Sequence, residues 1–295
     1  MAYFSRGVVR GTSHPKSGVM LRDAIRDQIR TVMGSDEAAA VDLTRPAGDD
    51  GLFGPHSASW QVHGDFTAMM IGGISALLLQ MLHPAVLAGV WDHSGFRDDM
   101  AGRLKRTARF ITATTYGSTD TAEAMIARVR HVHGFVRGIL PDGTPYSADD
   151  PRLLTWVHVA EARSFLAAYV RYRDPGFSGA RQDQYLVEMA DIARRLGATD
   201  VPESRAAVEA YLRPMRRALA VDDRTRDVAR VLLEQPAPNL ASRPLQQILL
   251  QSGVDLLPDW ARTMHGLRVP LREKVALRAG AIGAGTVLRW ALAAR

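Results

Sequence analysis

Apolar residues recur along most of this chain at the three- and four-residue spacing of an amphipathic helix. No stretch shows the strict alternation of apolar and polar residues that is typical of a half-buried strand. The segment 45–60 is rich in Gly, Pro, Asp and Ser and predicts a loop, and Pro141-Asp142-Gly143 predicts a turn. The predicted helices cover residues 21–34, 65–82, 84–91, 98–116, 120–138, 152–172, 180–196, 204–218, 224–233, 245–253 and 271–295. The pattern therefore predicts an all-α fold.

The segments between the predicted helices are short, and the chain contains no repeat of fixed period. A length of 295 residues allows one large domain or two small ones. We expect a single all-α domain over residues 21–295, preceded by a flexible tail over residues 1–20. A chain of this size buries roughly three quarters of the surface that it exposes when unfolded, so it has room for a deep internal pocket.

Charge and apolar content narrow the class of protein. The formal net charge is +6, and arginine carries nearly all of the positive charge without any long basic run, which disfavours binding to nucleic acid. Some of these arginines are suited to holding carboxylates, including haem propionates. The longest apolar stretch, 66–82, falls short of the roughly 20 residues of a membrane span, so we expect a buried core helix there.

The chain contains no cysteine. This excludes disulfides, cysteine nucleophiles, thiolate-ligated haem and cysteine-ligated iron–sulfur clusters. Residues 1–11 hold two arginines but no long apolar run after them, unlike a signal peptide. We expect a cytoplasmic protein, in which any redox metal is held by histidine.

The helix predicted over 120–138 carries two histidines at different positions around its axis. His133 falls on an apolar stripe with helical spacing, whereas His131 is about 200° further round, beside Arg128 and Phe135. The stripe comprises Ala122, Met125, Ile126, Val129, Val132 and Val136. We therefore expect His133 to face the interior. A histidine there is either a core residue with a hydrogen-bond partner or a metal ligand, such as the axial ligand of a haem iron.

The preceding predicted helix places Arg103, Arg106 and Thr107 on one face, three and four residues apart. Phe110 and Thr114 continue this face, and apolar residues follow the other. A cationic strip beside an apolar strip suits the wall of a pocket. The hydrogen-bond donors of the cationic strip would hold an oxygen species there or stabilise developing negative charge. A solvated helix face has the same pattern, and the sequence leaves both interpretations open.

Other histidines and a tryptophan are further candidates. Trp156 and His158 are two residues apart, so they cannot face the same way on a helix. His83 precedes Pro84, where we expect it to bond a backbone carbonyl at a helix end, and His93 lies in a predicted loop. The sequence has no HExxH or CxxCH motif, which disfavours zinc protease chemistry and covalent c-type haem.

Several short motifs follow one another in a recognisable order. They are Leu79–Val86, Gly89–Ser94, Gly102–Thr107, His133–Gly138, Pro145–Ser147 and Trp156–His158. In this order and spacing the chain resembles the MpaB and latex-clearing-protein family of haem oxygenases, over roughly residues 60–270.

The resemblance implies a globin-like, all-α core around one non-covalent haem b, with His133 as the ligand of the iron. It also implies a distal Arg-x-x-Lys-Thr pattern, which this chain matches with Arg103, Arg106 and Thr107. Arginine replaces lysine at position 106, which keeps the charge but changes its shape. The remaining side chains expected at the cofactor are Phe110, Trp156, His158 and His83.

The function that the resemblance implies is oxidation of a small, apolar organic substrate by dioxygen, with an electron donor as a further partner. The reaction is oxidative C=C cleavage, hydroxylation or desaturation. The chain is shorter than the rubber oxygenases and we expect no export signal, so extracellular polymer cleavage is not implied. Two alternatives stay open: a haem protein that senses or stores without oxidising, and a non-catalytic helical regulator that binds a ligand.

Overall fold

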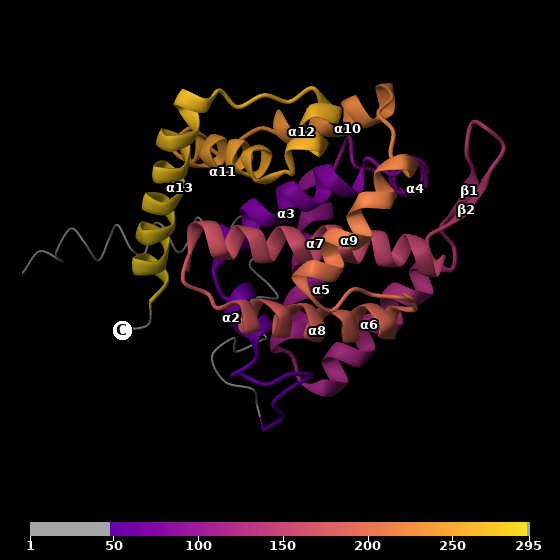
Figure 1. Ribbon diagram of the computed structural model, residues 1–295, viewed down its shortest axis with the longest axis horizontal. Helices are drawn as coiled ribbons and strands as arrows, with labels where there is room; N and C mark the ends of the chain where they lie inside the picture. Colours follow the sequence, from indigo (N-terminus) through magenta and orange to yellow (C-terminus); the bar gives the residue numbers. More distant parts are fainter. Residues whose placement is uncertain (1–47, 294–295) are drawn as a thin grey trace, which may run out of the picture.

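The computed structural model describes residues 48–293, and the tail and helix predicted before residue 48 lie outside that range. The fold is almost entirely helical (Figure 1). Its elements are α2 (Ala58–His63), α3 (Phe66–Gln80), α4 (Pro84–His93), α5 (Met100–Tyr116), α6 (Thr119–His133), β1 (Arg137–Ile139), β2 (Pro145–Ser147), α7 (Pro151–Tyr172), α8 (Gly179–Leu196), α9 (Arg205–Met215), η1 (Arg216–Ala218), α10 (Asp223–Leu233), α11 (Arg243–Leu256), α12 (Asp259–His265) and α13 (Leu271–Leu292). The predicted all-α class is confirmed.

Helices α3 and α7 form the centre of the molecule and pack along each other (Figure 1). Helix α3 consists almost wholly of apolar and small residues, and most of its side chains are buried. Gly72 permits the close approach, because a Cβ at this position would lie 2.7 Å from Phe165 Cδ1 and 2.9 Å from Phe165 Cα. Helices α11 and α13 cover α3, and α8 covers α7, so α3 and α7 present the core that the other helices surround.

Two buried carboxylates anchor the C-terminal helix α13 to the core. Asp65 is the N-cap of α3 and accepts a hydrogen bond from Ala68 N at 2.8 Å. Its other oxygen accepts from Arg289 of α13, also at 2.8 Å. The cap stabilises the start of α3, where the free backbone N–H groups and the helix dipole favour a negative charge, and Arg289 suits the last turn of α13, where the dipole favours a positive one.

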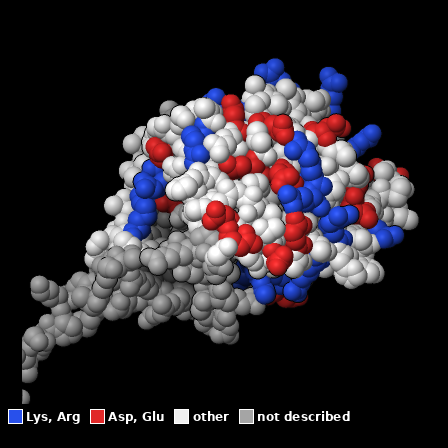
Figure 2. Space-filling view, turned by 90° about the horizontal axis from the view of Figure 1, so that it is seen from below, with Lys and Arg blue, Asp and Glu red and all other residues white. Residues whose placement is uncertain are grey.

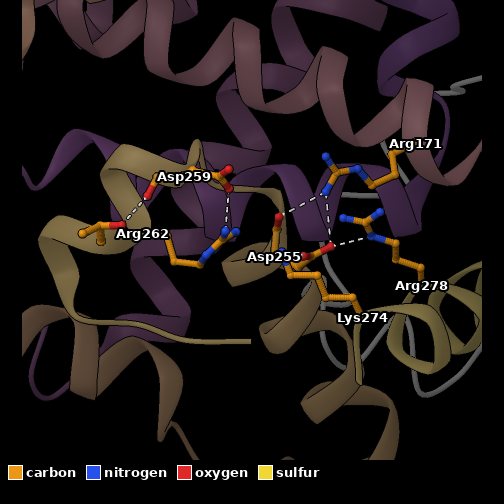
Figure 3. A network of polar contacts seen from close by, with 7 residues as sticks. Arg171, Asp255, Asp259, Arg262, Lys274 and Arg278 are labelled. Atoms are coloured by element: carbon orange, nitrogen blue, oxygen red, sulfur yellow. Dashed lines mark hydrogen bonds and ion pairs between the residues drawn. The ribbon is translucent and has the colours of Figure 1, made fainter. Parts of the chain in front are cut away.

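The second carboxylate is Asp255 of α11, which Figure 3 shows at the meeting point of α7, α11 and α13. Its side chain is fully buried. Asp255 Oδ2 accepts from Arg278 Nε at 2.7 Å and from Arg171 Nη1 at 3.3 Å, and Lys274 Nζ lies 3.6 Å from Oδ1. Burial opposes ionisation, but Arg278 and the other cations outweigh it and lower the pKa of Asp255. This carboxylate therefore stays charged and ties three helices together.

Most predicted helix limits agree with the structure to within a few residues, but the helix predicted over 120–138 ends at His133. The chain then forms an antiparallel hairpin in which Arg137 pairs with Ser147, and Gly143 occupies the predicted turn with a φ of +88°. The strands have three residues each, too few for an alternating pattern to show. The residue that caps this helix is Ser118, which accepts from Thr121 N.

Two short helices, α2 and α12, were not expected. Helix α2 starts inside the segment predicted as a loop, where Ser57 caps it by accepting from Trp60 N. Helix α12 follows Pro258 and ends at Gly266, whose φ is +69°. Each has one or two turns, which is too short for an apolar stripe to stand out.

The surface carries both signs of charge in close alternation. Figure 2 shows acidic and basic side chains interspersed over the face seen from below. On α8, Arg195 pairs with Asp191 at 2.8 Å and also with Glu123 of α6.

Among the described helices, none is by itself long and apolar enough to span a bilayer; α3 and α4 meet that criterion only as a pair, bent by 106°.

Candidate functional site

His133 is the last residue of α6 and lies at the centre of its inward face. Ala122 and Ile126 of the predicted stripe are buried, and His133 is half-buried, whereas His131 is exposed. The prediction that Val132 belongs to the inward-facing stripe was wrong, because this side chain is 51% exposed. Val132 is about 100° from His133 around the axis, so it falls outside the narrow strip that α5 and α8 cover.

The imidazole of His133 has no hydrogen-bond partner within the part of the chain that the structure describes. Burial lowers its pKa, and the nearby carboxylate of Asp149 opposes this shift. The ring is therefore neutral near pH 7, with a lone pair on one nitrogen and a proton on the other. Asp149, held by the hydroxyl of Ser147, is the acidic group beside it.

His83 lies near the same region but has a different role. We expected it to bond a backbone carbonyl, and the structure instead makes it the N-cap of α4. Its Nδ1 accepts from Ala85 N at 3.3 Å, so a neutral ring carries its proton on Nε2. Burial lowers the pKa of His83, with Asp150 opposing, so the neutral form prevails. His83 can donate a hydrogen bond through Nε2. In this tautomer Nε2 has no lone pair to bind a metal, and the lone pair of Nδ1 is already used by Ala85 N.

Trp156 and His158 of α7 face different ways, as their spacing predicts. Trp156 is fully buried and donates through Nε1 to the carbonyl of Gln80 at 3.2 Å. A side chain that would contact a ligand needs surface that the protein leaves uncovered, and Trp156 has none. Trp156 fixes the end of α3 against α7. Its ring also lies near that of His83, with the centroids 6.2 Å apart and the planes tilted by 42°.

His158 is half-buried, and its ring makes no hydrogen bond to any described residue. Burial lowers its pKa to about 4, and the positive charge of Arg194 adds to that effect. Like His133, it therefore offers a neutral imidazole to the interior.

The predicted cationic face of α5 divides into two parts. Arg106 is exposed and pairs with Asp99, the N-cap of its own helix, at 3.3 Å. Arg103 is half-buried: burial lowers its pKa, Arg106 lowers it further, and Glu161 of α7 opposes both. Thr107 is half-buried as well and donates to the Arg103 carbonyl at 3.4 Å. Arg103 and Thr107 thus face inward, whereas Arg106 reaches the surface.

Phe110 continues the inward face of α5. It is half-buried against the main core, as are its neighbours Leu104 and Ile111 and, from α7, Val157. These four side chains are the partly buried apolar residues of α5 and α7 that the candidate site offers to a ligand.

Helices α5 and α7 are not closely packed against each other. Within residues 48–293, α5 makes its extensive contacts with α6 and α2, and α7 with α3 and α8. Arg103 of α5 and Glu161 of α7 are nevertheless near enough for each to affect the other's pKa. Together with His158, one helical turn before Glu161, they form the polar part of the candidate site. His133 lies at the end of α6, with Asp149 as its acidic neighbour.

Sequence reasoning missed Glu161 and Asp149. Glu161 is three residues after His158, and this helical spacing was a signal that would have placed the two on one face. Asp149 gave no such signal, because it reaches His133 only through the turn that the hairpin makes before α7.

Another histidine, His63, is accounted for by the core. Its Nδ1 lies 2.8 Å from Thr115 Oγ1 and its Nε2 3.0 Å from the Tyr185 hydroxyl. Burial lowers its pKa to about 3. Both nitrogens are occupied, so His63 is a structural residue. Over the described ranges, no three His, Asp or Glu side chains are grouped so that they alone could hold a metal ion.

The resemblance indicated by the ordered motifs is confirmed by comparison with known families. The family model described as "ER-bound oxygenase mpaB/B'/Rubber oxygenase, catalytic domain" matches residues 60–290. No curated protein and no solved structure gives a significant match. The match spans α3 to α13 and includes all the residues of the candidate site. The chain therefore belongs to the mpaB and rubber oxygenase family.

Proposed function

We propose that this protein is a haem b-dependent oxygenase that acts with dioxygen on a small, largely apolar organic substrate. The observation that carries the proposal is the His133 ring, a neutral imidazole without a hydrogen-bond partner among the described residues, on the inward face of α6. A porphyrin supplies four nitrogen ligands to its iron, so one imidazole with a free lone pair completes such a site.

The surrounding residues fit a haem as well. His133 would bind the iron through one nitrogen, and the nearby carboxylate of Asp149 would accept a hydrogen bond from the other, which would fix the ring and raise its basicity. Arg103 is a desolvated cation suited to an anionic group. Leu104, Phe110 and Val157 of α5 and α7 leave part of their apolar surface uncovered. When bound, the haem supplies binding and activation of dioxygen.

The remaining steps belong to this chain's own side chains. The Arg103 guanidinium presents donors from α5, which would orient an oxygen atom and stabilise negative charge that develops on it. The Thr107 hydroxyl donates to the Arg103 carbonyl, so it would offer its lone pairs as an acceptor. The apolar side chains of α5 and α7 would hold the substrate and keep water away. Arg106 acts from the surface, where its pairing with Asp99 closes the first turn of α5. Oxidative C=C cleavage, hydroxylation and desaturation are all compatible with this arrangement, with an external electron donor where the reaction needs one.

The visible spectrum of protein expressed with a haem precursor tests the proposal. We expect a Soret band, loss of haem or a changed ferric spectrum in His133→Ala, and an unchanged spectrum in the matched control His131→Ala. His131 is exposed and two residues away, so the control carries the same substitution on the same helix. A protein without a Soret band would refute the haem assignment. Full haem in His133→Ala, with loss in His131→Ala, would refute the assigned ligand.

Oxygen uptake separates an oxygenase from a haem protein that only senses or stores. The reduced, haem-loaded protein is mixed with candidate apolar substrates, and dissolved oxygen is followed with an electrode. We expect consumption that depends on the substrate and disappears in Arg103→Gln. Reversible oxygen binding without consumption for every substrate would favour the sensor.

A further inference from the structure

Helix α13 directs three of its four cations to carboxylates of the core. Lys274 and Arg278 pair with the buried carboxylate of Asp255. Arg289 donates to the buried carboxylate of Asp65 at 2.8 Å. A surface helix ordinarily turns its charged residues to solvent and its apolar residues to the core. On α13 these three charges are used on the inner side, so the outer side is left to other residues.

The outer side of α13 carries an uncharged row that is open to solvent. Leu271 is 81% exposed, Val275 75% and Ile282 44%, and the row also contains the exposed residues Ala279 and Thr286. Successive members are four, four, three and four positions apart, so they share one side of the helix over about 22 Å. Figure 1 shows this helix at the edge of the molecule, and its extensive contacts among the described elements are with α11, α3 and α7. An extended apolar surface of this kind marks a place where another element or molecule binds. We call these five residues the α13 row.

Residues 21–34 lie outside the described range, and their sequence predicts an amphipathic helix. Its apolar side consists of Leu21, Ile25, Ile29 and Val32, which are four, four and three positions apart, as are the first four members of the α13 row. The five charged residues of the segment fall on the other sides of that helix: Arg22, Asp23, Arg26, Asp27 and Arg30. An isolated helix of about 14 residues is only marginally stable in water, so this one needs an apolar partner surface.

The connection between this segment and the described domain is long enough to bring the two apolar sides together. Residues 35–47 span up to about 45 Å when extended, whereas α13 is about 33 Å long. The described chain begins at residue 48, in the loop before α2. Asp65, the N-cap of α3, follows shortly after α2 and holds Arg289 of α13. The connection therefore starts from a part of the fold that lies close to the C-terminal end of α13.

We propose that residues 21–34 form a helix that packs its apolar side on the α13 row of the same molecule. The pairing buries both apolar sides and leaves the charges of the segment in solvent. An attached segment has an effective concentration in the millimolar range, which favours it over a second copy of the chain in a dilute solution. This inference is independent of the proposed function, since it involves neither haem nor substrate.

Tryptic cleavage of the native, full-length protein at Arg30 tests whether the segment is packed. A packed helix is cut only while it is open, so the rate reports the open fraction. We expect cleavage at least about tenfold slower than in a synthetic peptide of residues 15–40, because burial of one valine or isoleucine side chain shifts an equilibrium by that factor or more. Cleavage as fast as in the peptide would overturn the proposal.

Substitutions on the two helices test whether the α13 row is the partner. Val275→Asp puts a charge into the row and should speed cleavage at Arg30 about tenfold or more. Val187→Asp is the matched control, because Val187 is 46% exposed on α8, outside the row, and should leave the rate unchanged. Ile25→Asp should act like Val275→Asp, and the double variant should be cut no faster than either single one. Equal rates in wild type and Val275→Asp, or the same acceleration in Val187→Asp, would overturn the proposal.

Introduced cysteines identify the molecule that covers the row, since the chain has none of its own. Ile25→Cys combined with Ala279→Cys places one thiol near the middle of each apolar side, so a short bismaleimide should join them within one molecule whichever way the helix runs. Asp27→Cys combined with Ala279→Cys is the matched control, because Asp27 is about 200° away from Ile25 around the predicted helix. Its yield should be several-fold lower. Equal yields from the two pairs, or cross-links mainly between two molecules, would overturn the proposal.

Discussion

Substitution of Asp255 by asparagine tests whether the buried carboxylate in Figure 3 holds α13 on the core. Asparagine keeps the shape of the side chain and removes its charge. Arg278, Arg171 and Lys274 then lose the anion that they share, and they repel one another more strongly. The expected result is a loss of stability without a change of fold.

The magnitude follows from the contacts. A hydrogen bond to a charged group contributes about 1.5–3 kcal/mol, and Asp255 makes a short one at 2.7 Å and a longer one at 3.3 Å. Breaking a fully buried pair costs about 3–5 kcal/mol, but Arg278 and Arg171 are 42% and 34% exposed and regain water. We therefore expect Asp255→Asn to lower the free energy of unfolding by about 2–3 kcal/mol.

Urea unfolding at pH 7 measures this loss as a shift of the midpoint at constant m-value. Asp259→Asn is the matched control: Asp259 pairs with Arg262 in the same view, but it is 90% exposed, so we expect a loss below about 1 kcal/mol. The pKa of Asp255 is lowered in the folded state. Its contribution is therefore present above the unfolded value near about 4 and is lost as pH falls through the folded pKa. Equal losses in the two variants, or an Asp255→Asn loss that persists undiminished at pH 2, would refute the reasoning.

Other substitutions test the packing and the buried histidine of the core. Gly72→Ala should cost about 1–3 kcal/mol, since the new Cβ would overlap Phe165 Cα, a backbone atom that cannot move aside easily. Gly283 lies at an exposed position of α13 with nothing within 4 Å of an added Cβ, so Gly283→Ala should raise the free energy of unfolding by about 0.5–1 kcal/mol. If urea titrations showed that both alanine variants stabilise the protein, or that both destabilise it, this account would be contradicted. His63 has a folded pKa of about 3, so wild-type stability should fall about tenfold in the folding constant per pH unit as pH drops below about 6.5. In His63→Gln the free energy of unfolding should fall less steeply as pH drops from 7 to 4, by the slope that corresponds to uptake of one proton. An identical slope in wild type and variant would show that His63 does not cause this fall.

The sequence alone predicted the helical class and most helix positions. Helices of ten residues or more repeat their apolar spacing several times, as α5, α8, α10 and α11 do. Helix α3 was instead indicated by a long apolar run. It also separated His133 from His131 correctly, because the angle between two residues on one helix does not depend on what packs against it. Ordered motifs along the chain were enough to indicate the family.

The tertiary structure decided which side chains of each helix have an environment suited to chemistry. Arg103 and Arg106 share a face by spacing, but only the helix ends and the position of α7 turn Arg106 toward Asp99 and Arg103 toward Glu161. His83 had the residue type of a metal ligand, and the N–H of Ala85 fixes its proton on the wrong nitrogen. Periodicity describes a single helix, whereas desolvation and partnership depend on atoms that arrive from other helices. For that reason His133 was found from the sequence, whereas its neighbour Asp149 and the residue Glu161 near Arg103 were found only in the folded chain.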